Sequence, residues 1–389
     1  MFTDQTALSS LDVTFERSDT IRFVLDDDPS LDWLRTCDLS AYQRIFIYID
    51  ATVQRIWGTA LTAAFASHGQ AVFWMPLEAS ESTKSLDFYP TALAFLETNG
   101  ASRYDLVVGI GGGIVLDLVS FLTSTYMRGL PFYAIPTTLV GQMDASTAGK
   151  TCLNTPSAKN VLGTFYYPRV VYNNICFLST NTPFFLRQGY SEVYKYGLLR
   201  SPELIAILEA HRADNAPEHL REVVRRSIDT RVLIRKQDSL ASNLGHTFGH
   251  AIEKLSNYNI LHGDAISAGT VMALHYARRR GLARDGAPER IVEQMKRFNL
   301  NVFFQAGTSA DDMVRLMLRD KKSSADALHL VLIRDAGEPY FEAGSFFYRA
   351  EPNDVRQFLA EYLATSPFAH PDCAAFLRRD HLYDTAPVA

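Results

Sequence analysis

Cysteine is scarce in this chain, and its cysteines form no motif. Cys37, Cys152, Cys176 and Cys373 are scattered and include no Cys-x-x-Cys pair, which argues against a thiolate metal site and against a disulfide framework. Apolar runs are also short: none approaches the roughly 18 residues that span a bilayer, and the N-terminus lacks a basic region followed by an apolar core. We therefore expect a cytoplasmic protein that makes no contact with a membrane.

A surplus of basic charge is missing as well. The net charge is −5 and the isoelectric point is about 6.1, and no Lys/Arg tract is interleaved with aromatic residues, so nucleic acid is excluded as a partner. Internal repeats and low-complexity segments are also absent from the sequence. What is present is a globular composition, 47% hydrophobic and 21% charged over 389 residues, which is long enough for two domains with separate cores.

Strand and helix patterns alternate over the first part of the chain. Strands are predicted at residues 44–50, 71–75 and 105–113, with helices at 53–67 and 88–98, an alternation typical of a parallel sheet. From Pro183 onward the pattern is almost entirely helical. The sequence thus predicts an α/β domain over residues 1–180 and a mainly α-helical domain over 181–389. We also expect an antiparallel hairpin over residues 11–25 at the sheet edge, and an appendage from Pro367 onward.

Three histidines lie close together in the predicted helical domain. His246 and His250 are four residues apart in a helical pattern, so both imidazoles lean from one helix face, and His262 follows after a short loop. Neutral imidazoles and one carboxylate are ligands that zinc accepts, with a position left open for a substrate. A His-x-x-x-His pair also occurs by chance in ordinary helices. A metal site therefore needs a carboxylate from elsewhere in the chain.

A glycine triplet, Gly111 to Gly113, joins a buried strand pattern to a helix pattern. Such a turn lets backbone N–H groups approach a pyrophosphate at the N-terminus of the helix. It is not the Gly-x-Gly-x-x-Gly fingerprint, and it reads equally well as a tight strand-to-helix turn. Downstream, residues 142–160 form a dense polar segment rich in Asp, Lys, Asn and Gly, which in isolation is typical of a surface loop.

Taken together, these segments resemble the dehydroquinate synthase family of sugar-phosphate cyclases over roughly residues 40–345, with the motifs in the family's order. The segments that carry the likeness are Asp50 and residues 81–84, 111–117, 136–138, 142–150, 159–163, 192–195 and 243–250. The resemblance implies NAD and a divalent metal, zinc or cobalt, as cofactors. The metal ligands that it implies are Glu192, His246 and His262. The NAD-binding residues that it implies are Asp50, Glu81, Lys84, Gly112, Gly113, Ile114, Asp117, Thr137, Thr138, Lys159 and Thr180.

The resemblance also implies a reaction. A hydroxyl of a sugar phosphate is oxidised by NAD, phosphate leaves by elimination, the hydride returns, and the opened ring closes by an intramolecular aldol reaction. Asp144 and Lys195 are expected on the substrate hydroxyls. The residues expected to surround the phosphate are Arg128, Lys150, Asn160, Asn243, His250 and one of Lys321 and Lys322, of which Lys322 is favoured.

The sequence departs from the family's pattern at the position expected to bind the substrate carboxylate. Shikimate-pathway members have an arginine seven residues before the first histidine, where this chain has Ser239. Arg231 stands where the family has lysine, and Asn181 where an apolar residue is usual. His250 distinguishes the chain from valiolone-type cyclases, and Asn243 from deoxy-scyllo-inosose synthases. We therefore expect a homodimeric cyclase of specialised metabolism, whose substrate is a neutral-headed sugar phosphate such as sedoheptulose 7-phosphate or glucose 6-phosphate.

Three alternatives stay open on the sequence alone. The chain could be a true 3-dehydroquinate synthase acting on a 2-keto acid sugar phosphate. It could be a metal-dependent oxidoreductase of the glycerol dehydrogenase type, which would not need Lys150, Asn160 and Arg128 to hold a phosphate. It could also be a non-catalytic relative that keeps the fold and binds a partner, although the candidate residues Glu192 and Lys195 are chemically competent.

Overall fold

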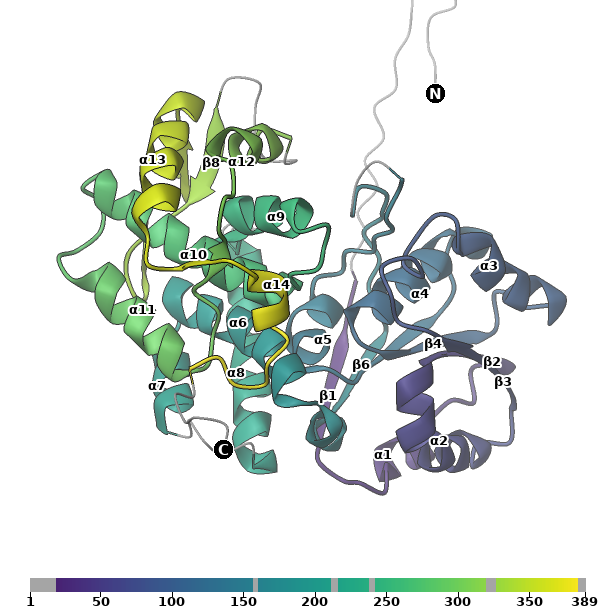
Figure 1. Cartoon of the computed structure of the whole chain (residues 1–389). Coiled ribbons are helices and arrows are strands. Elements are labelled where there is room, and N and C mark those ends of the chain that lie inside the picture. Colours follow the sequence, from purple (N-terminus) through teal and green to yellow (C-terminus); the bar gives the residue numbers. More distant parts are fainter. Residues whose placement is uncertain (1–18, 157–159, 211–215, 238–241, 320–326, 384–389) are drawn as a thin grey trace, which may run out of the picture.

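The computed structural model describes residues 19–156, 160–210, 216–237, 242–319 and 327–383. Figure 1 shows two bodies side by side, a sheet-containing N-terminal part and a mainly helical C-terminal part. The predicted fold class, an α/β domain followed by a mainly α-helical one, is confirmed. Among the described helices, none combines the length and the apolar character that crossing a membrane requires.

The N-terminal part is built on a parallel sheet. Within the described residues this sheet has six strands in the order β1-β6-β5-β4-β2-β3, and every pairing is parallel. Its central strands read as nearly continuous apolar runs because helices cover both faces; Phe46 to Ile49, for example, are fully buried. The strands are β1 (Arg22–Asp26), β2 (Arg44–Asp50), β3 (Ala71–Leu77), β4 (Leu106–Gly111), β5 (Phe132–Pro136) and β6 (Val170–Asn174).

Helices connect these strands and pack as two apolar layers on the sheet's faces. From β2 the chain continues to β3, at one edge of the sheet, whereas from β4 it continues to β5, toward the opposite edge. The strand order therefore reverses between β2 and β4. Ligands of open α/β sheets bind at such a reversal, beyond the carboxyl ends of the strands. The helices are α1 (Asp32–Thr36), α2 (Ala51–Ala66), α3 (Tyr89–Thr98), α4 (Gly113–Thr125) and α5 (Leu139–Met143).

The C-terminal part packs helices around one large apolar core. Its short strands lie in two-stranded pairs, β7 (Phe304–Gln305) with β12 (Ala369–His370), β8 (Leu328–Val331) with β11 (Phe347–Ala350), and β9 (Ile333–Asp335) with β10 (Glu338–Pro339). The helices are α6 (Pro183–Leu199), α7 (Pro202–Ala210), α8 (Pro217–Gln237), α9 (His246–Leu255), α10 (His262–Arg279), α11 (Ala287–Arg297), α12 (Ala310–Met317), α13 (Pro352–Thr365) and α14 (Cys373–Phe376).

Two sequence-based predictions need correction. β1 lies at the sheet edge as expected but runs parallel to β6, and residues 11–18 of the predicted antiparallel hairpin lie outside the described residues. The C-terminal segment is not an appendage, because β12 pairs with β7 and Cys373 and Leu377 are buried in the helical core. The last sheet strand ends at Asn174 and α6 begins at Pro183, which brackets the position where we expect the domain boundary.

Candidate active site

Glu192, His246 and His262 meet where three helices converge. Glu192 is on α6 and is 0% exposed, and the two histidines are the first residues of α9 and α10. Glu192 Oε1 lies 3.5 Å from His262 Nε2 and 3.8 Å from His246 Nε2, and one ligand atom from each residue fits within a 4.8 Å group. Oε1 has no hydrogen-bond partner among the described residues. A buried carboxylate oxygen that faces two imidazole nitrogens fits a bound cation.

The other nitrogen of each imidazole faces a protein oxygen. His246 Nδ1 lies 3.1 Å from the carbonyl oxygen of Leu244, and His262 Nδ1 lies 3.3 Å from Glu253 Oε2. These contacts select the tautomer that leaves Nε2 for a metal. Partial burial by itself would lower the pKa of His262, but the carboxylates of Glu253 and Glu192 raise it to about 10. Without a metal, His262 therefore carries a proton that a metal would displace.

Glycines allow the three helices to approach closely. A Cβ on Gly263 would lie 2.5 Å from the backbone oxygen of Gln188 on α6, and a Cβ on Gly269 would lie 2.2 Å from that of Gly245. Gly245 itself has φ +75, a left-handed conformation that glycine adopts at little cost. Because α6, α9 and α10 come into backbone contact here, the ligands from three distant segments can reach one point.

A second polar network lies beside this group. Lys195 donates a hydrogen bond to Glu192 Oε2, and Asp144 accepts from the Tyr196 hydroxyl and from Arg231 Nε, the latter at 2.9 Å. Burial would raise the pKa of Asp144, but Arg231 and Lys195 together lower it to about 2. Asp144 is thus held as a carboxylate.

The residues expected around a phosphate come from both domains. His250 lies with the metal group, its ring centroid 5.4 Å from that of His246, and Asn243 lies three residues before the start of the same helix. Lys150 and Asn160 belong to the N-terminal domain, where Asn160 Oδ1 lies 3.2 Å from Cys152 Sγ. A phosphate held by all four would bridge the two domains.

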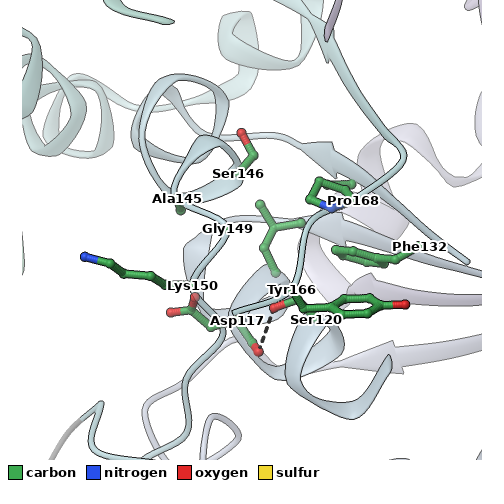
Figure 2. Close-up of a pocket in the computed structure, with 11 residues that line it drawn as sticks. Asp117, Ser120, Phe132, Ala145, Ser146, Gly149, Lys150, Tyr166 and Pro168 are labelled. Atoms are coloured by element: carbon green, nitrogen blue, oxygen red, sulfur yellow. Dashed lines mark hydrogen bonds between the residues drawn. The ribbon is translucent and has the colours of Figure 1, made fainter. Parts of the chain in front are cut away.

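Arg128 and Lys150 both lie near α4 in the N-terminal part. Arg128 follows the C-terminal end of α4, and this helix of 13 residues separates it by about 20 Å from the glycine turn. Lys150 borders a small hollow lined by α4, β5 and residues 145–168, with its ammonium pointing away from Phe132 and Tyr166 (Figure 2). This hollow contains none of the candidate metal ligands. Lys159, Lys321, Lys322 and Ser239 lie outside the described residues.

The expected NAD positions gather at the carboxyl ends of β2 and β4. Asp50 ends β2 and caps α2 by accepting from Thr52 N at 2.7 Å. Gly112 and Gly113 begin α4, whose N-terminus has no side-chain cap among the described residues. A Cβ on Gly112 would lie 3.1 Å from Thr138 Cγ2. The N-terminus of α4 therefore offers backbone N–H groups to an anion.

The remaining expected cofactor residues lie on several elements of the N-terminal part. Lys84 is buried and donates to Asp117 Oδ2 at 2.6 Å, while Glu81 accepts from Asn154 at 2.7 Å. Thr137 is buried at the end of β5, Ile114 lies in the first turn of α4, and Thr180 donates to the carbonyl oxygen of Phe177 at 2.8 Å.

Sequence reasoning missed Glu253 and Tyr196. Glu253 lies three residues after His250 on the same helix, so its spacing could have marked it as a neighbour of the histidines. Tyr196 had no such signal, because its partner Asp144 is 52 residues away in sequence.

Fold and site together define a class of two-domain proteins, in which a parallel α/β domain precedes a helical domain that carries a carboxylate and histidine group. The family model described as 3-dehydroquinate synthase N-terminal matches residues 74–187, and the C-terminal model matches residues 189–323. This chain therefore belongs to the 3-dehydroquinate synthase family.

Curated relatives agree with this assignment. The 3-dehydroquinate synthase of Cereibacter sphaeroides is 34% identical over 337 residues, which cover 83% of this chain and 90% of that protein. The 3-dehydroquinate synthase of Streptococcus gordonii is 35% identical over 306 residues, which cover 76% of this chain and 85% of that protein.

Solved structures share the fold. A 2-deoxy-scyllo-inosose synthase complexed with carbaglucose-6-phosphate, NAD+ and Co2+ is 20% identical with a TM-score of 0.79, over 87% of this chain and 96% of that chain. A 2-epi-5-epi-valiolone synthase from Streptomyces hygroscopicus with NAD+ and Zn2+ bound is 25% identical with a TM-score of 0.80, over 91% of this chain and 99% of that chain. An iron-containing alcohol dehydrogenase, 14% identical with a TM-score of 0.62 over 91% of this chain and 100% of that chain, shares the fold alone.

Proposed function

We propose that this chain is an NAD- and divalent-metal-dependent sugar-phosphate cyclase, a lyase that eliminates phosphate and forms a carbocycle. The observation that carries the proposal is the meeting of three possible ligand atoms: the fully buried Oε1 of Glu192 lies 3.8 Å from His246 Nε2 and 3.5 Å from His262 Nε2. One carboxylate and two imidazoles suit zinc or cobalt with a position left for substrate. Such a metal would polarise the substrate oxygen that is oxidised and later the aldol carbonyl. Glu192, His246 and His262 would hold it.

The glycine turn supports NAD as the second cofactor. Gly112 and Gly113 lie where the strand order reverses, and the N-terminus of α4 can receive a pyrophosphate. NAD would accept a hydride from the substrate and return it, so that none is consumed. The other residues of the proposed cofactor site are Asp50, Glu81, Lys84, Ile114, Asp117, Thr137, Thr138, Lys159 and Thr180.

Asp144 and Lys195 would orient the substrate hydroxyls. A carboxylate with a pKa of about 2 accepts a hydrogen bond from a hydroxyl but is a poor proton acceptor. The leaving phosphate, whose second pKa is about 6, is the better base for the proton lost in the elimination. Lys195 would donate to the substrate oxygen from the position where it now donates to Glu192. The residues that would bind the phosphate are Asn243, His250, Lys150, Asn160, Arg128 and Lys322. We also propose that the working unit is a homodimer.

The environment of Arg231 supports a neutral head group on the substrate. With serine at position 239, Arg231 is the described cation nearest to Asp144, and it is already paired with that carboxylate. A substrate carboxylate in a water-poor site needs a cation of its own, and such a contact contributes about 1.5 to 3 kcal/mol. The buried Nη1 of Arg231 has no partner within the described residues and could donate to a hydroxyl. A sedoheptulose 7-phosphate-like ketose or a hexose 6-phosphate fits these groups.

A second candidate, 3-dehydroquinate synthase itself, is favoured by the 34% and 35% identical relatives of that name. Both candidates are tested with one substrate panel, catalytic NAD and Co2+, by following inorganic phosphate. We expect phosphate release without net NADH, fastest with a neutral-headed sugar phosphate, and abolished in Lys195→Met. If the 2-keto acid has the highest kcat/KM, the second candidate is correct. Stoichiometric NADH without phosphate would refute both and indicate a dehydrogenase.

A further inference from the structure

The C-terminal segment is fastened to α6 through one guanidinium group. Arg187 on α6 is 2% exposed. Its Nη1 donates to the carbonyl oxygens of Arg379 and Asp380 at 2.8 and 3.2 Å, and its Nη2 donates to that of Leu377 at 2.5 Å. Figure 1 shows this segment, drawn in yellow, running across α10 toward α6. A planar fork spreads five donors over a wider span than the single ammonium of a lysine, so it can reach carbonyls and a carboxylate that lie apart.

The same guanidinium reaches the first turn of α10. Arg187 Nε donates to Asp264 Oδ1 at 2.9 Å, and Gln188 Nε2 donates to Asp264 Oδ2 at 2.7 Å. The backbone N–H of Asp264 donates in return to Gln188 Oε1 at 3.1 Å. Each oxygen of this buried carboxylate therefore accepts a hydrogen bond from a side chain of α6, which compensates the carboxylate for its loss of water.

A third contact completes the α6–α10 seam, by which we mean the contacts of Arg187, Gln188 and Ser191 with Gly263 and Asp264. The hydroxyl of Ser191 donates to the carbonyl oxygen of Gly263 at 2.5 Å. Since a Cβ on Gly263 would nearly overlap the backbone of Gln188, the two helices cannot approach further here. The first turn of α10 is thereby fixed in both distance and rotation relative to α6.

The seam lies one residue from two of the candidate metal ligands. Glu192 follows Ser191 on α6, and His262 precedes Gly263 on α10, so the seam sets the 3.5 Å separation between Glu192 Oε1 and His262 Nε2. We propose that Arg187, held by the C-terminal segment, is a positioning residue for the metal: it keeps His262 against Glu192 without touching the metal or the substrate. This inference rests on the metal site of the proposed function and assigns a role to the C-terminal segment.

The chain provides a matched control in the other domain. Arg44 likewise joins a fully buried carboxylate, Asp105, at 2.8 Å, and donates to the carbonyl oxygens of Asn99 and Gly100 at 3.0 and 2.7 Å. Its loss should also destabilise the fold, by less than that of Arg187, because its side chain is 28% exposed and Asp105 keeps hydrogen bonds from Ser102. It lies on β2, in the N-terminal domain, and has no contact with α6 or α10 among its described partners. Comparing the two arginines separates general destabilisation from positioning.

The experiment measures Co2+ binding to the full-length protein by equilibrium dialysis and the visible spectrum of the bound Co2+. Loss of a contact that orients a metal ligand without touching the metal typically weakens metal binding by roughly 10–100-fold. We expect Arg187→Met to weaken binding by such a factor and to change the Co2+ spectrum, Arg187→Lys to be intermediate, and Arg44→Met to lower the melting temperature while leaving affinity and spectrum unchanged.

Several outcomes would overturn parts of this reasoning in distinguishable ways. If folded Arg187→Met binds Co2+ with the wild-type affinity and spectrum, Arg187 only stabilises the fold. If Arg187→Met does not fold, Asp264→Asn keeps the shape of the seam and removes its charge, and unchanged Co2+ binding in that variant refutes the positioning role. If the wild-type protein binds no Co2+, the metal site of the proposed function is at fault instead.

Discussion

Removing the metal from the purified protein should leave it folded, and the resulting fall in melting temperature should grow with pH. In the metal-free protein, protonated His262 supplies the positive charge that Glu253 and Glu192 need, since these carboxylates raise its pKa to about 10 despite partial burial. Because this pKa is raised above the ordinary value of 6.5, the stabilisation is complete below that pH and is lost as the pH rises toward 10. The metal-bound protein has no such proton to lose.

The size of the effect follows from exposure and linkage. The side chain of His262 is 43% exposed, so solvent screens the pairs, and we expect only ~1–2 kcal/mol of pH-dependent stabilisation. At a metal concentration of about 100 times Kd, binding itself adds about 2.7 kcal/mol. With roughly 2–4 °C per kcal/mol for a domain of this size, chelation should lower the melting temperature by about 5–11 °C at mildly acidic pH, and by a further 2–8 °C in alkali.

Circular dichroism melts with and without a chelator, at several pH values between about 6.5 and 9.5, measure this difference. His262→Gln is the control for the metal-free protein, because in chelator its melting temperature should lose the pH dependence that His262 gives the wild type. Loss of helical signal at room temperature on chelation would show that the site is structural rather than catalytic. A difference that stays constant or shrinks with rising pH would refute the assigned charge pairing of His262.

Three further predictions follow from single residues. His246→Ala should abolish stoichiometric metal in the purified protein, whereas His250→Ala should retain it, as measured by elemental analysis; equal loss in both would mean that the ligands are misassigned. Gly263→Ala should destabilise the protein by at least ~2 kcal/mol, because its Cβ would lie 2.5 Å from a backbone oxygen, while Gly58→Ala in α2 should be neutral or stabilising in the same denaturant titration. Burial and a neighbouring arginine lower the pKa of His275 to about 4, so the protein should lose up to ~2 kcal/mol as the pH falls from 6.5 toward that value. That acid-side loss should be absent in a His275→Gln variant, and an unchanged pH dependence would exclude His275 as its source.

Periodicity in the sequence predicted the strands that match β2, β3 and β4 and the helices that match α2 and α3, but it gave no prediction for β6. The strand predicted at residues 44–50 matches β2, and the helix predicted from Pro183 matches the start of α6, because buried parallel strands read as continuous apolar runs and amphipathic helices repeat every 3.6 residues. The direction of β1 could not be predicted in this way. Pairing partners distant in the chain are chosen by packing, which local pattern does not encode.

For the candidate site, too, some features were determined by the sequence and others only by the tertiary structure. The sequence alone determined the residue types, since a pair of histidines four apart, a third histidine and Glu192 can be recognised by spacing and by resemblance to a family. Only the tertiary structure decided that His262 Nδ1 faces Glu253, that Asp144 is held by Tyr196, and that the C-terminal segment fastens the helices of the metal group. Most of these contacts join segments that are far apart in sequence, 52 residues for Tyr196 and Asp144 and 190 for Arg187 and Leu377, so local pattern does not encode them. Spacing along the chain fixes which groups a helix presents, and packing between helices fixes what those groups meet.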